Sequence, residues 1–188
     1  MHRITNIIHK ALENKQYCTV AFLDISQAFG KVGHEGLLSK LPTFLPDNMY
    51  KILQSYLTNR HFTTKYREAY SSLRPILAGV PQGSVFGPLL YLIYTADLPT
   101  LENSTTATFA DDTAILTVHE DPTMAAHRPQ MHLNKIQSWL KTWRMKANET
   151  KSVQVTFILN NTTCPPVKLN NEHLPQADEV KYLGIHLD

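Results

Sequence analysis

Length, composition and charge set the first limits on this chain. It has 188 residues, of which 43% are hydrophobic and 18% charged, as in one globular domain or a piece of a larger one. A net charge of +2 excludes binding of a polyanion through bulk charge alone, so such binding needs a local group of cations. Two distant cysteines exclude a disulfide framework, and no apolar run approaches the ~20 residues of a membrane span. We therefore expect an intracellular protein of the cytoplasm or nucleus, neither secreted nor in a membrane.

The first half of the chain reads as helices around one buried strand. Residues 2–14 carry apolar side chains at helical spacing. Residues 17–23 form the near-continuous apolar run of a strand that is covered on both faces, and this run ends at Asp24. An ionised carboxylate at the end of a buried strand needs a partner. Two further helices and a hairpin are predicted at residues 35–41, from an N-cap at Asp47, and at residues 60–77.

Glycines and prolines in residues 79–88 predict an irregular loop, with Pro88 opening a helix that is apolar nearly all round and therefore buried. A later amphipathic helix is expected to begin at or after Pro129, because a proline inside a helix costs ~3 kcal/mol. Lys151 precedes an alternating strand, and Asn170-Asn171 predicts a hairpin turn.

Two adjacent carboxylates, Asp111 and Asp112, lie at the corner of a predicted tight hairpin, between residues that favour extended backbone. Like charges so close repel unless a cation or a proton neutralises them, and paired carboxylates are ligands that Mg²⁺ accepts. The alternative is a solvated turn, in which Asp is common. If residues 17–23 lie beside this hairpin, Asp24 joins the pair, and three acids can hold two divalent ions about 4 Å apart.

Five ordered motifs carry a family resemblance. They are Phe22–Phe29, Gly79–Ser84, Phe109–Asp112, Lys151 ahead of its strand, and Lys181–Ile185. In this order they resemble the motifs of reverse transcriptases, most nearly the polymerases of insect jockey-like non-LTR retrotransposons. The resemblance implies an α+β polymerase palm over residues 1–188, with an antiparallel sheet, helices packed on one face, and fingers and thumb mostly missing. Within it, residues 58–78 would be a basic hairpin and residues 179–188 a strand that grips the primer.

The resemblance also implies roles for single residues. Asp24, Asp111 and Asp112 would be catalytic and, with Ile25, would hold Mg²⁺ or Mn²⁺, while Lys151 would act as general acid. The substrate residues would be Phe29, Gln82 and Gly83, and those for nucleic acid Arg60, Lys65, Arg67, Tyr182, Leu183 and Gly184. Plainer interpretations stay open: Phe29 as a core residue, Lys151 as a salt-bridging surface residue, and the hairpin cations as a solvated face.

Two hypotheses for function follow. The first is an RNA-directed DNA polymerase domain of a mobile element, which transfers nucleotides from dNTPs to a primer 3′-hydroxyl on an RNA or DNA template, within a larger polyprotein carrying fingers, thumb and an endonuclease. The second is an inactive, truncated remnant that at most binds nucleic acid or metal. The intact carboxylates favour the first. Gly30 and Gly33, where the family usually has Asp and Trp, and Pro129 favour the second. A phospho-acceptor signalling domain is excluded, because repeated strand–helix units are absent.

Overall fold

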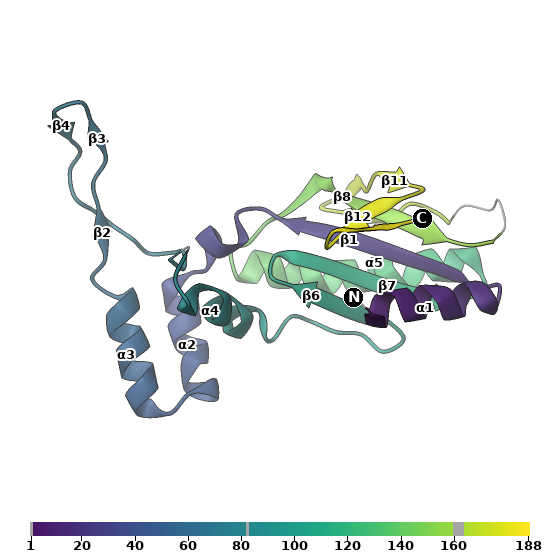
Figure 1. Cartoon of the computed structure of the whole chain (residues 1–188), viewed down its shortest axis with the longest axis horizontal. Helices are drawn as coiled ribbons and strands as arrows, with labels where there is room; N and C mark the ends of the chain where they lie inside the picture. The colour runs from purple at the N-terminus through teal and green to yellow at the C-terminus, as the bar shows by residue number, and fades with distance from the viewer. Residues whose placement is uncertain (1, 82, 160–163) are drawn as a thin grey trace. The chain divides into compact units, whose positions relative to one another are not determined.

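The computed structural model describes residues 2–81, 83–159 and 164–188 (Figure 1). The chain divides into two compact units. Met1–Ser26 and Leu98–Asp188 form the first unit, and Gln27–Asp97 form the second.

The first unit is built on a five-stranded sheet in the order β11-β8-β1-β7-β6. Its elements are α1 (His2–Glu13), β1 (Tyr17–Ile25), β6 (Thr105–Phe109), β7 (Asp112–His119), α5 (Pro122–Thr142), β8 (Ala147–Phe157), β9 (Lys168–Leu169), β10 (Glu172–His173), β11 (Gln176–Ala177), β12 (Val180–Tyr182) and β13 (Ile185–Leu187). The four longer strands pair antiparallel, which confirms the predicted antiparallel core of an α+β fold, while the short β11 runs parallel to β8.

The central strand β1 is covered on both faces, as its apolar sequence predicts. On one face Cys18, Val20 and Phe22 pack in a core with α1 and with the β12–β13 hairpin. On the other face lies α5, where the Ala125 carbonyl accepts a hydrogen bond of 3.0 Å from the Thr117 hydroxyl on β7. In Figure 1, α5 lies behind the sheet, and α1 and β12 lie in front. The prediction that the helices pack on one face is therefore wrong, because a strand apolar on both faces needs a cover on each.

Helix α5 runs through Pro129, so the prediction that it begins at or after this residue is also wrong. Its N-cap is Asp121, which accepts the Met124 N–H at 2.8 Å. Pro129 has no N–H to donate to the Ala125 carbonyl one turn earlier. The Thr117 hydroxyl donates to that same carbonyl, so the acceptor left by the proline has a partner. This donor belongs to a strand, which is why the helix sequence alone does not reveal it.

The C-terminal segment differs from the single strand predicted for residues 179–188. It forms a hairpin in which β12 pairs with β13. The turn consists of Leu183 and Gly184, whose φ angles of 49° and 82° are left-handed and reverse the chain. The predicted turn at Asn170-Asn171 is confirmed, and its φ angles of 52° and 67° are those of a two-residue hairpin turn.

The second unit consists of three helices and a long two-part hairpin. Its elements are the 3₁₀ turn η1 (Ala28–Lys31), α2 (His34–Phe44), α3 (Asp47–Leu57), β2 (His61–Phe62), β3 (Lys65–Tyr66), β4 (Ala69–Tyr70), β5 (Arg74–Pro75) and α4 (Phe86–Thr95). Helix α3 begins at Asp47, but its N-cap is Pro46, so the predicted cap is wrong by one residue.

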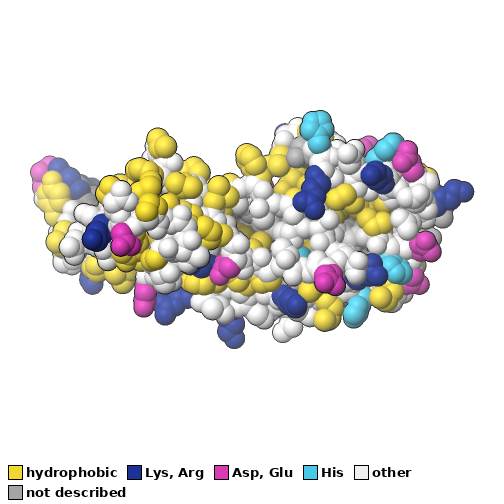
Figure 2. Space-filling model, turned by 90° about the horizontal axis from the view of Figure 1, so that it is seen from below, with side chains coloured by type: hydrophobic (Ala, Val, Ile, Leu, Met, Phe, Trp, Pro, Cys, Tyr) yellow, Lys and Arg dark blue, Asp and Glu magenta, His cyan; other side chains and the backbone are white. Residues whose placement is uncertain are grey.

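Helix α4 is only half covered, although the sequence predicts a buried helix. Leu90, Tyr91 and Tyr94 are buried, whereas Leu89 and Leu92 are exposed. Figure 2 shows hydrophobic side chains gathered on the surface of this unit. An apolar composition without polar positions therefore did not separate the covered face of α4 from its exposed face.

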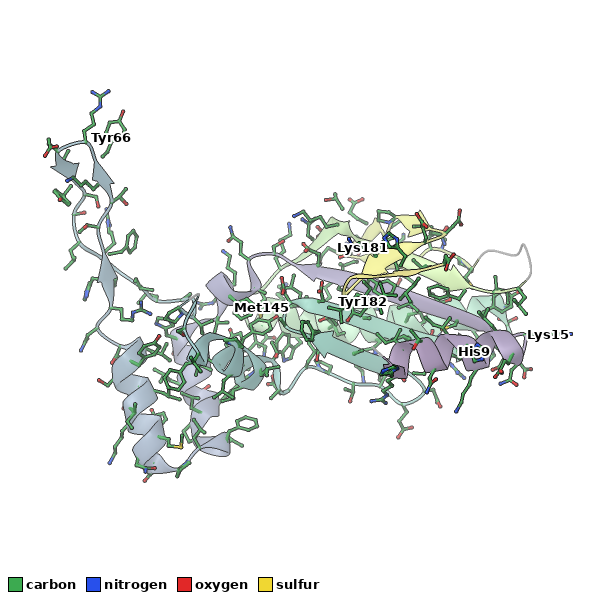
Figure 3. All side chains as sticks on the ribbon, in the orientation of Figure 1. His9, Lys15, Tyr66, Met145, Lys181 and Tyr182 are labelled. Carbon is green, nitrogen blue, oxygen red and sulfur yellow. The ribbon has the colours of Figure 1, made fainter. Side chains whose placement is uncertain are left out.

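The hairpin of the second unit has no buried side of its own. Every residue from 61 to 75 is exposed, and Tyr66 stands near its tip (Figure 3). An isolated two-stranded ribbon is marginally stable in water.

In the described part of the chain, no helix is long and apolar enough to cross a membrane.

Replacing Thr117 with Val keeps the shape of the side chain and removes the donor to the Ala125 carbonyl. We expect the free energy of unfolding, measured by urea denaturation, to fall by about 1–3 kcal/mol, because a buried acceptor loses its partner. In a Pro129→Ala background the restored N–H can supply that hydrogen bond, so the same substitution should cost less. Equal costs in the two backgrounds would show that Thr117 does not compensate for the proline.

Candidate active site

Two carboxylates face each other across neighbouring strands of the sheet. β1 lies beside the Asp111-Asp112 hairpin, as expected, and Asp24 is the register partner of Asp112. Side chains of directly paired residues share one face of a sheet and have Cβ atoms about 4.5–5.5 Å apart. The alternation along β1 places this face on the side of Phe22, which packs against Tyr182 of β12 with ring centroids 5.0 Å apart.

The hairpin corner holds the two neighbouring acids in different ways. Phe109 pairs with Asp112, so the turn consists of Ala110 and Asp111. Asp112 is therefore the first residue of β7, fixed by pairing on both sides, and does not lie in the turn as predicted. Asp111 lies in the turn, and both acids are exposed. Ala110 has a φ of 53°, a left-handed conformation that costs a non-glycine residue on the order of 1 kcal/mol and occurs often at functional sites.

Two neighbouring acids act on the proton affinity of Asp112. Burial raises the pKa of Asp112 above its ordinary value, and the negative charges of Asp111 and Asp24 raise it further. Burial, with a contribution from Asp112, raises the pKa of Tyr182 to about 12. Among the described residues, none of the three acids forms an ion pair with a cationic side chain. A bound cation would therefore relieve the repulsion at this site.

Asp24 and Asp112 are the paired carboxylates available to a divalent ion at this site. Over residues 2–81, 83–159 and 164–188, no three side chains of His, Cys, Asp or Glu converge as ligands of one ion. The expected convergence of three acids is thus reduced to the facing pair, Asp24 and Asp112, with Asp111 beside it and Ile25 next along β1. Mg²⁺ is usually bound through one or two carboxylates, with water and substrate phosphate as its other ligands. The facing pair fits that requirement.

A serine that the sequence analysis missed holds Asp24 in place. The pairing of β1 with β8 shifts register between Phe22 and Asp24, and the buried Ser152 fills this irregularity. Its Oγ accepts the Asp24 N–H at 3.1 Å and donates to the Asn148 carbonyl at 2.7 Å. No local pattern singles out this serine, because its partners are set by the shifted register. Lys151 is the exposed neighbour of Ser152, so it lies in the irregular part of β8 next to Asp24.

In the second unit, the structure brings Phe29 and Gly83 together. The Val80 N–H donates to the Phe29 carbonyl at 3.0 Å, and the half-buried Phe29 ring packs 4.7 Å from the Tyr91 ring. Phe29 and Gly83 line one cavity of about 500 Å³. The other lining residues are Pro81, Ser84, Val85, Gly87 and Pro88. Gln82 lies outside the described residues.

The residues predicted to bind nucleic acid fall into two groups. In the exposed hairpin, the Lys65 ammonium lies 5.3 Å from the Tyr70 ring and the Arg67 guanidinium 5.5 Å from the Tyr66 ring. Arg60 lies 5.8 Å from the Tyr56 ring of α3. These contacts keep cations and aromatic faces side by side. In the C-terminal hairpin Tyr182 is buried as a packing residue, whereas Leu183 and Gly184 form an exposed turn.

Together, the α+β fold with its antiparallel central strands and the facing aspartates at the ends of β1 and β7 define a polymerase palm. The chain belongs to the reverse transcriptase (RNA-dependent DNA polymerase) family, whose model matches residues 1–187. This finding confirms the resemblance seen in the motifs.

Two relatives from Drosophila melanogaster show which reverse transcriptases the chain is similar to. It is 41% identical over 196 residues to the RNA-directed DNA polymerase from mobile element jockey, covering 100% of this chain and 21% of the relative. It is 40% identical over 198 residues to a probable RNA-directed DNA polymerase from transposon BS, covering 100% of this chain and 22% of that one. The chain thus spans about a fifth of the length of these relatives.

Solved structures with the same fold include two telomerases. A Candida tropicalis telomerase truncated from the C-terminal domain superposes with a TM-score of 0.65 at 12% identity, covering 100% of this chain and 38% of that one. A Candida albicans telomerase in complex with a fragment of telomeric RNA gives a TM-score of 0.60 at 14% identity, covering 93% and 32%. At this identity the likeness supports the palm fold alone.

Replacing Ser152 with Ala leaves the Asp24 N–H and the Asn148 carbonyl without their partner. We expect a loss of about 1–3 kcal/mol in the free energy of unfolding, measured by urea denaturation. Ser138→Ala is the matched control, since this exposed hydroxyl bonds only to a carbonyl of its own helix. A Ser152 variant as stable as the control variant would show that the hydroxyl does not hold the end of β1.

Replacing Asp112 with Asn should stabilise the chain at neutral pH. The folded-state pKa of Asp112 is raised above its ordinary value of 3.8, so the ionised carboxylate destabilises the fold above that raised pKa. The difference should shrink as the pH falls through the raised pKa and should vanish below 3.8, where Asp112 is protonated in both states. Thermal unfolding between pH 3.5 and 7 measures this, with the exposed Asp178→Asn as control. A variant less stable than wild type at pH 7 would contradict the expected repulsion.

Proposed function

We propose that this chain is the palm of an RNA-directed DNA polymerase of a mobile element, at which a primer 3′-hydroxyl attacks a deoxynucleoside triphosphate. The single observation that carries the proposal is the register pairing of Asp24 with Asp112. The negative charge of Asp111 also acts on Asp112 and raises its pKa. This pair has the ligand chemistry of a divalent metal site, and it occurs in a chain that belongs to the reverse transcriptase family.

The carboxylates supply the metal ligands in this proposal. Asp24 and Asp112 would hold Mg²⁺ or Mn²⁺, with Asp111 and Ile25 as adjacent ligands. When bound, such ions stabilise the charge on the attacking and leaving oxygens. The protein keeps the two facing aspartates in place through strand pairing and through the hydrogen bond from Asp24 to Ser152. A rigid, paired position is what a preorganised site requires.

Three residues are assigned to the nucleotide. Phe29 and Gly83 would contact it from their shared cavity, where the Phe29 ring, fixed against Tyr91, would exclude a ribose 2′-hydroxyl by its size. Gln82 would position nucleotide and template. Lys151 is exposed and one residue from Ser152, so it would donate a proton to the departing pyrophosphate as general acid.

The exposed hairpin is assigned to the template. Arg60, Lys65 and Arg67 would neutralise phosphates, and the neighbouring tyrosines would stack on bases. The turn of Leu183 and Gly184 after Tyr182 would face the DNA primer. Template, primer and dNTP would be bound within a longer polyprotein, which fits a chain that spans about a fifth of its relatives.

Primer extension on an RNA template, with Mg²⁺ and deoxynucleotides, tests the proposal. We expect extension by this chain to fall by at least about 100-fold in Asp24→Asn and in Asp112→Asn, because each removes a ligand of the reacting centre, and to persist in the charge-matched Asp178→Asn. Equal extension by wild type and Asp112→Asn would overturn the assignment. A chain that is folded by circular dichroism but extends no primer would favour the inactive remnant.

A further inference from the structure

A charged cleft lies at the C-terminal end of α5, apart from the facing aspartates. It encloses about 610 Å³ between the last turns of α5, the start of β8 and the turn at Asn170. It is on the α5 side of the sheet, whereas strand alternation places Asp24 and Asp112 on the side of Phe22 and Tyr182. The two sites are therefore separate.

Three cations line this cleft, against one acid among the described lining residues. Lys141, Arg144 and Lys146 are all exposed, and in the described part of the chain none of them forms an ion pair. Glu149 is that acid: its carboxylate accepts a hydrogen bond from Asn170 Nδ2, and the positive charge of Lys146 acts on it. Three positive charges against one negative charge leave the cleft with a net positive charge, and such a cleft concentrates anions.

The backbone conformation at Arg144 shows that the stability of the helix end does not explain why an arginine stands at this position. The Met145 N–H donates to the Leu140 carbonyl at 2.8 Å and the Arg144 N–H to the Lys141 carbonyl at 3.2 Å, which is the hydrogen-bond pattern of a Schellman motif. Arg144 has a φ of 54°, at the position that glycine usually takes in this motif. Glycine would therefore make a more stable helix end than arginine does.

The walls of the cleft are held by packing and by the sheet. Leu140 and Met145 are buried beneath it, and Met145 follows the end of α5 in Figure 3. The Lys146 carbonyl accepts the Ser26 N–H at 2.8 Å, and Ala147 pairs with Ile25. The three cations are thus carried on a fixed backbone rather than on a free tail.

We propose that this cleft binds phosphate groups of a nucleic-acid strand, at a site additional to the carboxylate centre. A guanidinium suits the bidentate recognition of phosphate, and the two ammonium groups supply further point charges. The volume exceeds that of a single ion and lies in the range of ligand sites. The inference rests on the proposed function only for the choice of nucleic acid as the ligand.

Fluorescence anisotropy with labelled single-stranded RNA, over a range of salt and with EDTA to silence the carboxylate centre, tests the cleft. The variant Lys141→Gln, Arg144→Gln, Lys146→Gln should bind more weakly, and its plot of log affinity against log salt should lose about two units of slope, since each phosphate contact contributes ~0.7. The control variant Lys10→Gln, Lys15→Gln, Lys51→Gln loses the same charge and should keep most of the RNA affinity and most of the salt slope. Equal affinity and slope in the two variants would overturn the proposal.

Competition with inorganic triphosphate separates the two sources of phosphate, a free polyphosphate and a nucleic-acid strand. Binding of triphosphate but not RNA at this cleft would also overturn the proposal.

Arg144→Gly separates binding from folding. We expect its melting temperature to rise by about 2–4 °C as the left-handed strain is removed, while RNA affinity falls. Wild-type affinity in this more stable variant would overturn the role of Arg144. Because these measurements involve no polymerisation, their failure is distinct from failure of the proposed activity.

Discussion

The register between β1 and β7 is the constraint on which the rest of the site depends. A slip of one residue would turn every side chain of β1 to the other face, which would remove Cys18, Val20 and Phe22 from the core that they form with α1 and the β12–β13 hairpin and would separate Asp24 from Asp112. The apolar core thus selects the one register in which Asp24 meets Asp112. The hydrophobic effect, acting several residues away, positions groups that it does not itself stabilise.

The site is arranged at a cost to stability that the surrounding core offsets. Asp112 is held where burial and two neighbouring charges oppose its ionisation, and Ala110 takes a left-handed conformation at the corner beside it. Arg144 at the end of α5 also takes a left-handed conformation. Features that break a local rule without a local gain are common where a structure serves a ligand. Among the described residues, neither the three acids nor Arg144 forms an ion pair.

Pro129 does not disrupt α5 and therefore does not favour an inactive remnant. Pro129 stands within a complete α5, because Thr117 supplies a donor to the carbonyl that the proline leaves free. Of the other departures, Gly30 lies within the short η1 segment and Gly33 is the N-cap of α2, which forms over its expected residues. A Cβ at Gly33 would meet the Tyr94 hydroxyl at an ordinary 3.5 Å, so no close backbone approach explains this glycine.

The sequence by itself determined the features with a local cause. The apolar run of β1, the hairpin around Ala110 and Asp111, and the turn at Asn170 follow from alternation and turn chemistry between near neighbours, and the ordered motifs identified the family. Tertiary structure decided the rest: helices on both faces of the sheet, the passage of α5 through Pro129, the support of Asp24 by Ser152, and the cationic cleft beside Arg144. Each of these features depends on partners that are distant in sequence or on a conformation that packing imposes. Local sequence patterns therefore do not predict them.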